Sequence, residues 1–464
     1  MTATASSLPR QKQWLAAPQP PLPRMGSAGP RKPKLVDLFC GAGGLSEGFR
    51  RVGFEVVAAA DHDPDACATY ERNFARAEVL CGDLRLPALR ERLVDLAAGA
   101  DMIVGGPPCQ AYSQVRNHAR LIDDPRNSLY REFVRTVREV RPVAFLMENV
   151  PGLAQMGVQD QVVADLSLDG EYDVTAQLVD AANFGVPQTR ERLLFLGVRR
   201  RRGISVPVLD GSGATGLVRL ERAKEERALA YKVGVAGGAE ADELAAQLAD
   251  WSSLQAVTVA QAISDLEGLA SGRRDDAIER TELGSPGSAY QRLMRRGLVA
   301  PSLTNVSVPR IREDTVLRLN EIPAGGNHRD LPDEFRARYL TDAKWGQHSG
   351  TGRLERRHYS AYRRLHPDLW AWTINTKADC AYHYRESRSL SVREFARLQS
   401  FPDYFEFTTD KRRGDGLPGR LPGGATHSRY RQVGNAVPPL LAQAAAKALI
   451  DHNVFAELGV LRTP

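Results

Sequence analysis

The chain of 464 residues has few cysteines and no long apolar run. Its five cysteines are an odd number without any Cys-x-x-Cys spacing, which speaks against a disulfide framework and against a zinc site. No stretch of about 18 uncharged apolar residues occurs, and the N-terminus has no charged start followed by an apolar core. We therefore expect a soluble protein of a reducing, cytoplasmic setting, with no membrane and no metal among its partners.

The composition is otherwise that of an ordinary globular protein. Hydrophobic residues make up 42% and charged residues 25% of the chain, which is long enough for two or three domains. The formal net charge of +6 is carried mostly by arginine, a side chain suited to forked contacts with phosphates and guanine edges. Taken alone, this charge is only weak support for a nucleic-acid partner.

Changes in amino-acid composition and in apolar periodicity along the chain predict its domain organisation. Residues 1–33 are rich in Pro, Ser and Ala without an apolar period, so they are expected to be a disordered tail. A first domain is expected over 34–270, with an insertion at about 200–257 in which 221–229 and 240–251 have helical patterns. Residues 271–424 show scattered Gly, Pro and His and one clear helix at 391–400, which predicts a smaller irregular domain. The final segment, 425–464, contains an amphipathic helix at 438–451.

Short apolar runs separated by helical patterns predict the fold of the first domain. Such alternation is typical of a mostly parallel, doubly wound α/β sheet. The expected strands are 35–39, 56–60, 102–104, 144–147 and 193–197, with a further strand that closes at Cys81.

A glycine-rich loop follows the first expected strand. In Asp37-Leu-Phe-Cys-Gly41-Ala-Gly43-Gly44 the glycines can let the chain turn tightly and admit a ligand near a helix N-terminus. The spacing is not that of a G-x-G-x-x-G dinucleotide loop, and Phe39 stands where an adenine ring can stack, which favours an adenosyl cofactor.

Two aspartates end the following strands. Asp61 lies 24 residues after Asp37 (61 minus 37), about where a doubly wound nucleotide site needs a carboxylate for ribose hydroxyls. Asp83, in Cys81-Gly-Asp83-Leu84, can accept a hydrogen bond from an adenine amino group. A helix N-cap for Asp61 and a turn aspartate for Asp83 are the structural alternatives.

A candidate nucleophile follows the strand at 102–104. In Gly105-Gly-Pro-Pro-Cys109-Gln110 two prolines hold the cysteine rigidly at the carboxyl end of a strand, where α/β sheets place their chemistry. By residue type alone a cysteine is more often buried and inert. A thiol of ordinary pKa is only a few per cent thiolate at neutral pH, so Cys109 needs positive surroundings, which Arg190 and Arg192 can supply.

A carboxylic acid and two arginines are expected beside this cysteine. Glu148 ends the next apolar strand, 39 residues after Cys109 (148 minus 109), and a protonated Glu148 can donate to ring nitrogen 3 of cytosine and neutralise charge that builds up on the ring. In Gln188-Thr-Arg190-Glu-Arg192, alternation would put both arginines on one face, toward a base oxygen or a phosphate. A salt-bridged glutamate and a solvated charged edge are the structural alternatives.

With these motifs in this order, the chain resembles the DNA (cytosine-5) methyltransferases, of the bacterial restriction-modification type. The resemblance implies a Rossmann-like S-adenosylmethionine-dependent domain with a target-recognition domain. The motifs that carry it are Asp37 to Gly44, Gly105 to Ser113, Asp124-Pro-Arg-Asn-Ser-Leu129, Glu148-Asn-Val150, Gln188 to Arg192, Arg393-Glu-Phe-Ala-Arg-Leu-Gln-Ser-Phe-Pro402 and Gln432-Val-Gly-Asn-Ala-Val-Pro-Pro439.

The resemblance also implies roles for individual residues. The thiolate of Cys109 would add to carbon 6 of a flipped-out cytosine, and Glu148 would donate the proton and recognise the base. Arg190 would hold the target base, and Arg192 would help to position the catalytic loop or the nucleophile segment. S-adenosyl-L-methionine would be bound by Phe39, Gly41, Ala42, Gly43, Gly44, Asp61, His62, Asp83, Leu84, Pro107, Leu129, Asn435 and Ala436. The loop expected to close on the DNA carries Ser113, Gln114, Arg116 and Arg120.

The expected partners are duplex DNA and a cognate restriction endonuclease acting on the same site, with the enzyme itself a monomer associated with the bacterial nucleoid through DNA. A transfer-RNA cytosine methyltransferase shares these motifs but has a compact recognition region. A non-catalytic DNA-binding relative should have lost Cys109, Glu148 or one of the arginines, and all are present. The sequence does not name the DNA site.

Overall fold

The computed structural model describes residues 31–108, 128–155, 157–201, 203–213, 216–217, 238–239, 256–332, 335, 362–410 and 424–458. The helical patterns at 221–229 and 240–251 and the tail before residue 31 lie outside these ranges. No described helix is long and apolar enough to cross a membrane.

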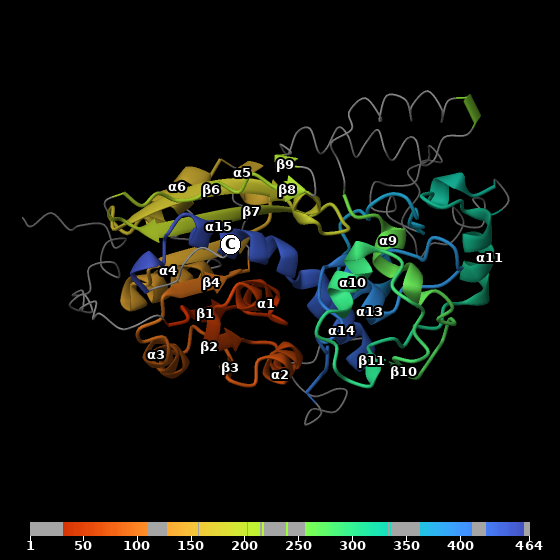
Figure 1. The fold of residues 1–464 in the computed structure, drawn as a ribbon, viewed down its shortest axis with the longest axis horizontal. Coiled ribbons are helices and arrows are strands. Elements are labelled where there is room, and N and C mark those ends of the chain that lie inside the picture. The colour runs from red at the N-terminus through yellow and green to blue at the C-terminus, as the bar shows by residue number, and fades with distance from the viewer. Residues whose placement is uncertain are drawn as a thin grey trace, which may run out of the picture.

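A seven-stranded sheet forms the centre of the molecule (Figure 1). Its strand order is β3-β2-β1-β4-β5-β7-β6, and β3, β2, β1, β4 and β5 run parallel, whereas β7 is antiparallel to both of its neighbours. The expected parallel, doubly wound sheet is therefore confirmed. The strands are β1 (Lys34–Leu38), β2 (Glu55–Asp61), β3 (Glu78–Cys81), β4 (Met102–Gly105), β5 (Ala144–Asn149), β6 (Tyr172–Asp180) and β7 (Glu191–Arg199).

Helices cover both faces of this sheet because successive strand residues alternate between two apolar clusters. Leu35 belongs to the cluster that also holds residues of α1 (Gly44–Arg51), α2 (Pro64–Asn73) and α15 (Pro439–Asp451). Val36, the next residue, belongs to the cluster on the other face, with α3 (Pro87–Leu96), α4 (Ser128–Val140) and α6 (Gln159–Leu166). This period of two is that of a strand buried on both sides.

The C-terminal helix α15 packs directly against α1, although almost 400 residues separate them in the sequence (439 minus 44). A Cβ on Gly44 would lie 2.1 Å from the carbonyl oxygen of Val437, and one on Gly48 would lie 2.4 Å from the Cβ of Ala442. Glycine at these two positions is thus what lets the helices touch. The residues just before α15, Asn435 to Val437, are thereby brought to the sheet edge where β1 ends.

The region after residue 258 forms a smaller, mostly irregular part beside the sheet. It contains α9 (Val259–Ile263), α10 (Ala289–Arg295), α11 (Glu313–Glu321), α13 (Val392–Leu398) and the short strands β10 (Ala277–Glu279) and β11 (Ser302–Thr304). The expectation of one clear helix in 271–424 was therefore wrong, since α10 and α11 lie there as well. They are seven and nine residues long, too short for a clear sequence period.

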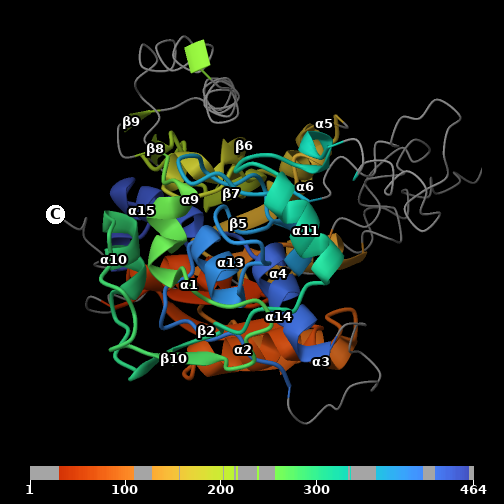
Figure 2. The same cartoon turned by 90° about the vertical axis from the view of Figure 1, so that its right-hand side faces the viewer.

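Helix α13 carries charged residues that serve the fold. Ser391 and Glu394 form a capping box, and Glu394 also accepts two hydrogen bonds from Arg388. Arg397 is fully buried and donates to both carboxylate oxygens of Asp403, at 2.9 and 2.7 Å. Helix α14 (Gly424–Asn435) lies beside α13 in both views, and it leads from this region back to α15 (Figures 1 and 2).

Candidate active site

A cavity of about 520 Å³ lies at the carboxyl ends of β1, β2, β4 and β5. In the order β3-β2-β1-β4-β5 the strands that follow β1 in sequence are added first on one side of it and then on the other, and open α/β sheets bind their ligands at such a topological switch point. Eleven of the residues expected from the sequence line this cavity. They are Phe39, Gly41, Gly44, Asp61, His62, Pro107, Glu148, Arg190, Arg192, Asn435 and Ala436.

The loop after β1 is shaped by residues in the left-handed region of backbone conformation. Phe39 has φ 57°, Gly41 has φ 51° and Gly43 has φ 96°. Phe39 is not a glycine, so this conformation carries strain, and its partly exposed ring lines the cavity. A Cβ on Gly41 would meet nothing within 4 Å, so the backbone here faces open space.

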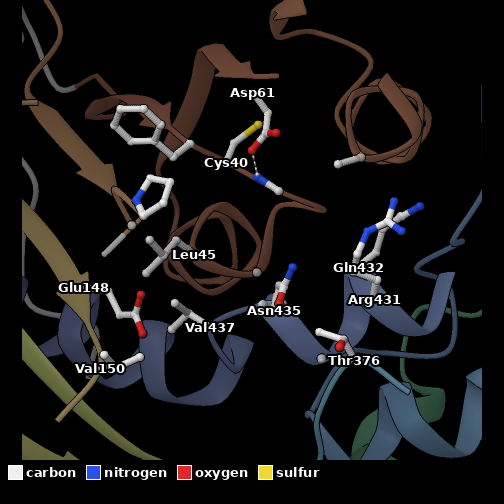
Figure 3. Close-up of a pocket in the computed structure, with 18 of the residues that line it drawn as sticks. Cys40, Leu45, Asp61, Glu148, Val150, Thr376, Arg431, Gln432, Asn435 and Val437 are labelled. Atoms are coloured by element: carbon white, nitrogen blue, oxygen red, sulfur yellow. Dashed lines mark hydrogen bonds between the residues drawn. The ribbon is translucent and has the colours of Figure 1, made fainter. Parts of the chain in front are cut away.

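Asp61 fixes the same loop from the neighbouring strand. Its Oδ2 accepts a hydrogen bond from the backbone N–H of Gly41 at 2.8 Å, and its Oδ1 accepts one from Asp63 at 2.8 Å. Figure 3 shows the hydrogen bond that Asp61 accepts, near the top of the view. The hydrogen bond between His62 and Asp61 raises the pKa of the exposed His62 ring, so imidazolium is favoured beside this carboxylate.

Glu148 and Arg192 form an ion pair at one end of the cavity. Arg192 Nε lies 2.6 Å from Glu148 Oε1, and both side chains are mostly but not fully buried. A Cβ on Gly106 would lie 3.0 Å from the other carboxylate oxygen, Oε2, so a glycine at that position leaves room for the glutamate. The pairing orients the carboxyl group in the cavity.

Arg190 also lines the cavity but has different partners. Its Nη1 donates to the carbonyl of Ile374 at 3.1 Å and its Nη2 to that of Gly434 at 2.6 Å. The side chain is 2% exposed, and burial lowers the pKa of its guanidinium. Two of the five N–H groups of its guanidinium are therefore bonded to backbone carbonyls. That Arg190 holds the target base stays a prediction.

The far wall combines the expected motif that begins at Gln432 with residues that no motif indicated, among them Thr376 and Arg431. Figure 3 shows Thr376, Arg431 and Gln432 opposite Glu148 and Val150, with Asn435 and Val437 between the two sides. Arg431 of α14 makes an ion pair of 3.1 Å with Asp63, the N-cap of α2. The residues 373–376 carry no motif that could have identified them.

Several expected site residues do not line the cavity. Gly43 packs under the loop, since a Cβ there would lie 2.5 Å from the ring of Phe74. Asp83 is bonded to Arg85, whose guanidinium lowers the pKa of the Asp83 carboxyl. Ala42 and Leu84 are buried and Leu129 is partly buried in α4. Outside the described residues lie Cys109, Ser113, Gln114, Arg116 and Arg120.

Comparison with known proteins gives matches over nearly the whole chain. The family model for C-5 cytosine-specific DNA methylases matches residues 33–451. The Type II methyltransferase M.AgeI of Thalassovita gelatinovora is 31% identical over 463 residues, which cover 90% of this chain and 99% of the relative. The Type II methyltransferase M1.HphI of Haemophilus parahaemolyticus is 28% identical, with 90% of this chain and 87% of the relative covered.

A solved structure shares the fold. An E. coli prophage protein described as a DNA modification methyltransferase superposes with a TM-score of 0.61 at 23% identity, covering 90% of this chain and 99% of its own. The arrangement of sheet, helices and smaller region is thus that of a known architecture.

Proposed function

Because the chain belongs to the family of C-5 cytosine-specific DNA methylases, its reaction is methylation of cytosine in DNA, and we propose that Cys109 is the nucleophile and that Glu148 and Arg192 activate the base. The observation that carries this proposal is the ion pair of Glu148 with Arg192 in the cavity that Pro107 and Pro108 also line. Cys109 follows Pro108 directly in the sequence.

The cavity fits S-adenosyl-L-methionine by the chemistry of its walls. Gly41 faces open space, Phe39 offers a ring face for adenine, and Asp61 offers carboxylate oxygens for ribose hydroxyls. The N-terminus of α1 at Gly44 and Leu45 suits the carboxylate of the methionine end, with Asn435 beside it. Bound there, the cofactor supplies the methyl group that carbon 5 of cytosine acquires.

Glu148 and Arg192 are proposed to act on the cytosine ring. Addition of a thiolate to carbon 6 puts negative charge on the ring, and a protonated Glu148 can neutralise it by donating to nitrogen 3. Arg192 orients the carboxyl group in the free enzyme and can turn its remaining N–H groups toward oxygen 2 of the base. In this proposal Arg192 is the arginine that acts on the base, and the assignment of the base to Arg190 is the alternative.

Cys109 is proposed to begin and end the reaction. Its thiolate forms the bond to carbon 6, and when the proton on carbon 5 is removed by a base, the carbon–sulfur bond breaks and the thiolate leaves. The cytosine must first rotate out of the duplex, which costs roughly a few kcal/mol that contacts with the protein must offset. We assign this recognition to the region 271–424, with the expected closing loop at 111–127.

The test uses the purified full chain and duplex DNA with labelled S-adenosyl-L-methionine. Label is expected in duplex DNA, and Cys109→Ala is expected to abolish it while binding of S-adenosylhomocysteine persists. A duplex with 5-fluorocytosine at the target should trap a covalent adduct, because fluorine cannot leave as a proton does. Normal turnover by Cys109→Ala would refute the nucleophile, and label in transfer RNA but not in DNA would refute the substrate.

We also propose that the chain is a monomeric component of a restriction-modification system. The relatives M.AgeI and M1.HphI are both named Type II methyltransferases, which supports this type. A cognate endonuclease would then cut the same site when it is unmethylated. Base-resolution methylation sequencing of DNA from cells that express the chain should give one short recurring site, whereas methylation without a shared sequence would contradict the assignment.

A further inference from the structure

Arg190 joins three parts of the chain that are far apart in the sequence. Its backbone N–H donates to Asp180 Oδ1 at 2.8 Å, which anchors it at the start of β7. Its guanidinium donates to the carbonyl of Ile374, 184 residues away, and to that of Gly434, 244 residues away. Since one planar group holds both carbonyls, the two backbones are kept at a fixed separation.

The first of these backbones continues a parallel pairing with the segment that carries Arg190. The N–H of Thr189 donates to the carbonyl of Ala371 at 2.8 Å, and the hydroxyl of Thr373 donates to the carbonyl of Thr189 at 2.7 Å. The residues 373–376 that follow line the cavity. They belong to the region to which we assign DNA recognition.

The second backbone is that of α14 just before Asn435, which lines the cofactor side of the cavity. A Cβ on Gly434 would lie 2.2 Å from the carbonyl oxygen of Asn375, so the two backbones touch at this point. A shift of the segment 373–376 therefore cannot leave Asn435 unmoved while Arg190 holds both carbonyls.

We infer that Arg190 is a positioning residue that couples binding of DNA at the 371–376 segment to binding of the cofactor at Asn435. This inference rests on the proposed function, since it takes the recognition region and the cofactor site from it. The coupling is reciprocal, so each ligand changes the affinity for the other by the same factor. In this inference Arg190 acts through the two backbones that its guanidinium holds.

The test measures the dissociation constant of S-adenosylhomocysteine by calorimetry, with and without a duplex that carries the site found by methylation sequencing. For the unchanged chain we expect the two constants to differ by roughly fivefold or more. In Arg190→Lys the ratio should fall toward one, because a single ammonium nitrogen cannot hold both carbonyls. A purely structural role would lower the unfolding temperature and leave the ratio unchanged.

Arg192→Lys is the matched control. It changes the arginine that contacts Glu148, so it should slow turnover and yet keep the affinity ratio of the unchanged chain. An unchanged ratio in folded Arg190→Lys would overturn the inference, as would a ratio of one in the unchanged chain. Failure of either ligand to bind at all would instead count against the proposed function.

Hydrogen exchange on the unchanged chain gives a second measurement if Arg190→Lys does not fold. DNA alone should alter exchange in the peptide spanning 433–437, and S-adenosylhomocysteine alone should alter exchange in 371–376. If neither ligand has an effect on the other's segment, the coupling is refuted.

Discussion

Asp37 makes the stability of the sheet depend on pH. It is fully buried under the loop that follows β1, and burial, with Asp61 adding to it, raises the pKa of its carboxyl to about 7 from the ordinary value of 3.8. Its Oδ2 accepts a hydrogen bond from Ser46 at 2.7 Å, whereas no hydrogen-bond partner of Oδ1 is found in the described part of the chain. The protonated form is therefore favoured in the folded state.

The direction in which stability changes with pH follows from the linkage between proton binding and folding. Between the ordinary and the raised pKa the folded chain binds the proton more tightly than the unfolded chain, so stability falls as the pH rises through this window. The shift from 3.8 to about 7 corresponds to about 4 kcal/mol at most, at 1.36 kcal/mol per pKa unit, and about 2 kcal/mol of it falls between pH ~5.5 and pH ~8. Asp37 thus costs the enzyme stability at neutral and higher pH.

Asp37→Asn should remove this dependence, because asparagine keeps an oxygen for Ser46 and does not ionise. Any cost of its buried amide group is the same at every pH. We expect the unfolding temperature of the variant, relative to the unchanged chain, to rise from pH ~5.5 to pH ~8, as followed by thermal denaturation. A difference that stays constant with pH, or that falls, would show that Asp37 is not the group described.

Three further changes test the site. Glu148→Gln keeps a hydrogen-bond partner for Arg192 but loses the acidic proton, so turnover should fall roughly 10²- to 10⁴-fold while calorimetry finds unchanged binding of S-adenosylhomocysteine. Gly106→Ala places a methyl group 3.0 Å from Glu148 Oε2 and should slow turnover about tenfold, whereas Gly152→Ala, which meets nothing within 4 Å, should leave it unaltered. Asp61→Asn should weaken S-adenosylhomocysteine binding about tenfold and leave DNA affinity alone, as read by calorimetry and gel shift; equal losses of both would contradict a cofactor role.

The sequence predicts those parts of the fold that are encoded locally. The strand β4 (Met102–Gly105) is an apolar run without a polar residue, and the capping boxes of Thr258 with Gln261 and of Ser391 with Glu394 mark the starts of α9 and α13. The strand β6 was not expected. It lies at the edge of the sheet, and its apolar residues Tyr172, Val174, Ala176 and Leu178 alternate with the polar Asp173, Thr175 and Gln177. This alternation is typical of a half-buried strand, so the sequence carried a signal that could have identified β6.

The cavity is harder to predict because its walls come together only in the folded chain. The ends of β1, β2, β4 and β5 could be found from the motifs at Phe39, Asp61, Pro107 and Glu148, since parallel strands bring their carboxyl ends to one edge. Residues 373–376 carry no such motif and reach the cavity through hydrogen bonds to Gln188 and Thr189.

For the two arginines of the Gln188 to Arg192 segment, the sequence predicts a shared location and does not predict the partners of each side chain. Alternation explains why both lie on the same cavity, because residues two apart in an extended segment share a face. It cannot say which one meets Glu148, since that depends on the carbonyls of Ile374 and Gly434. With those carbonyls bonded to Arg190, only Arg192 has its guanidinium on the acid. If the coupling experiment finds that Arg190 is a positioning residue, the two arginines of this segment have different roles although they look equivalent in the sequence. Arg190 then holds two walls of the cavity together, and Arg192 acts on the reacting base through Glu148.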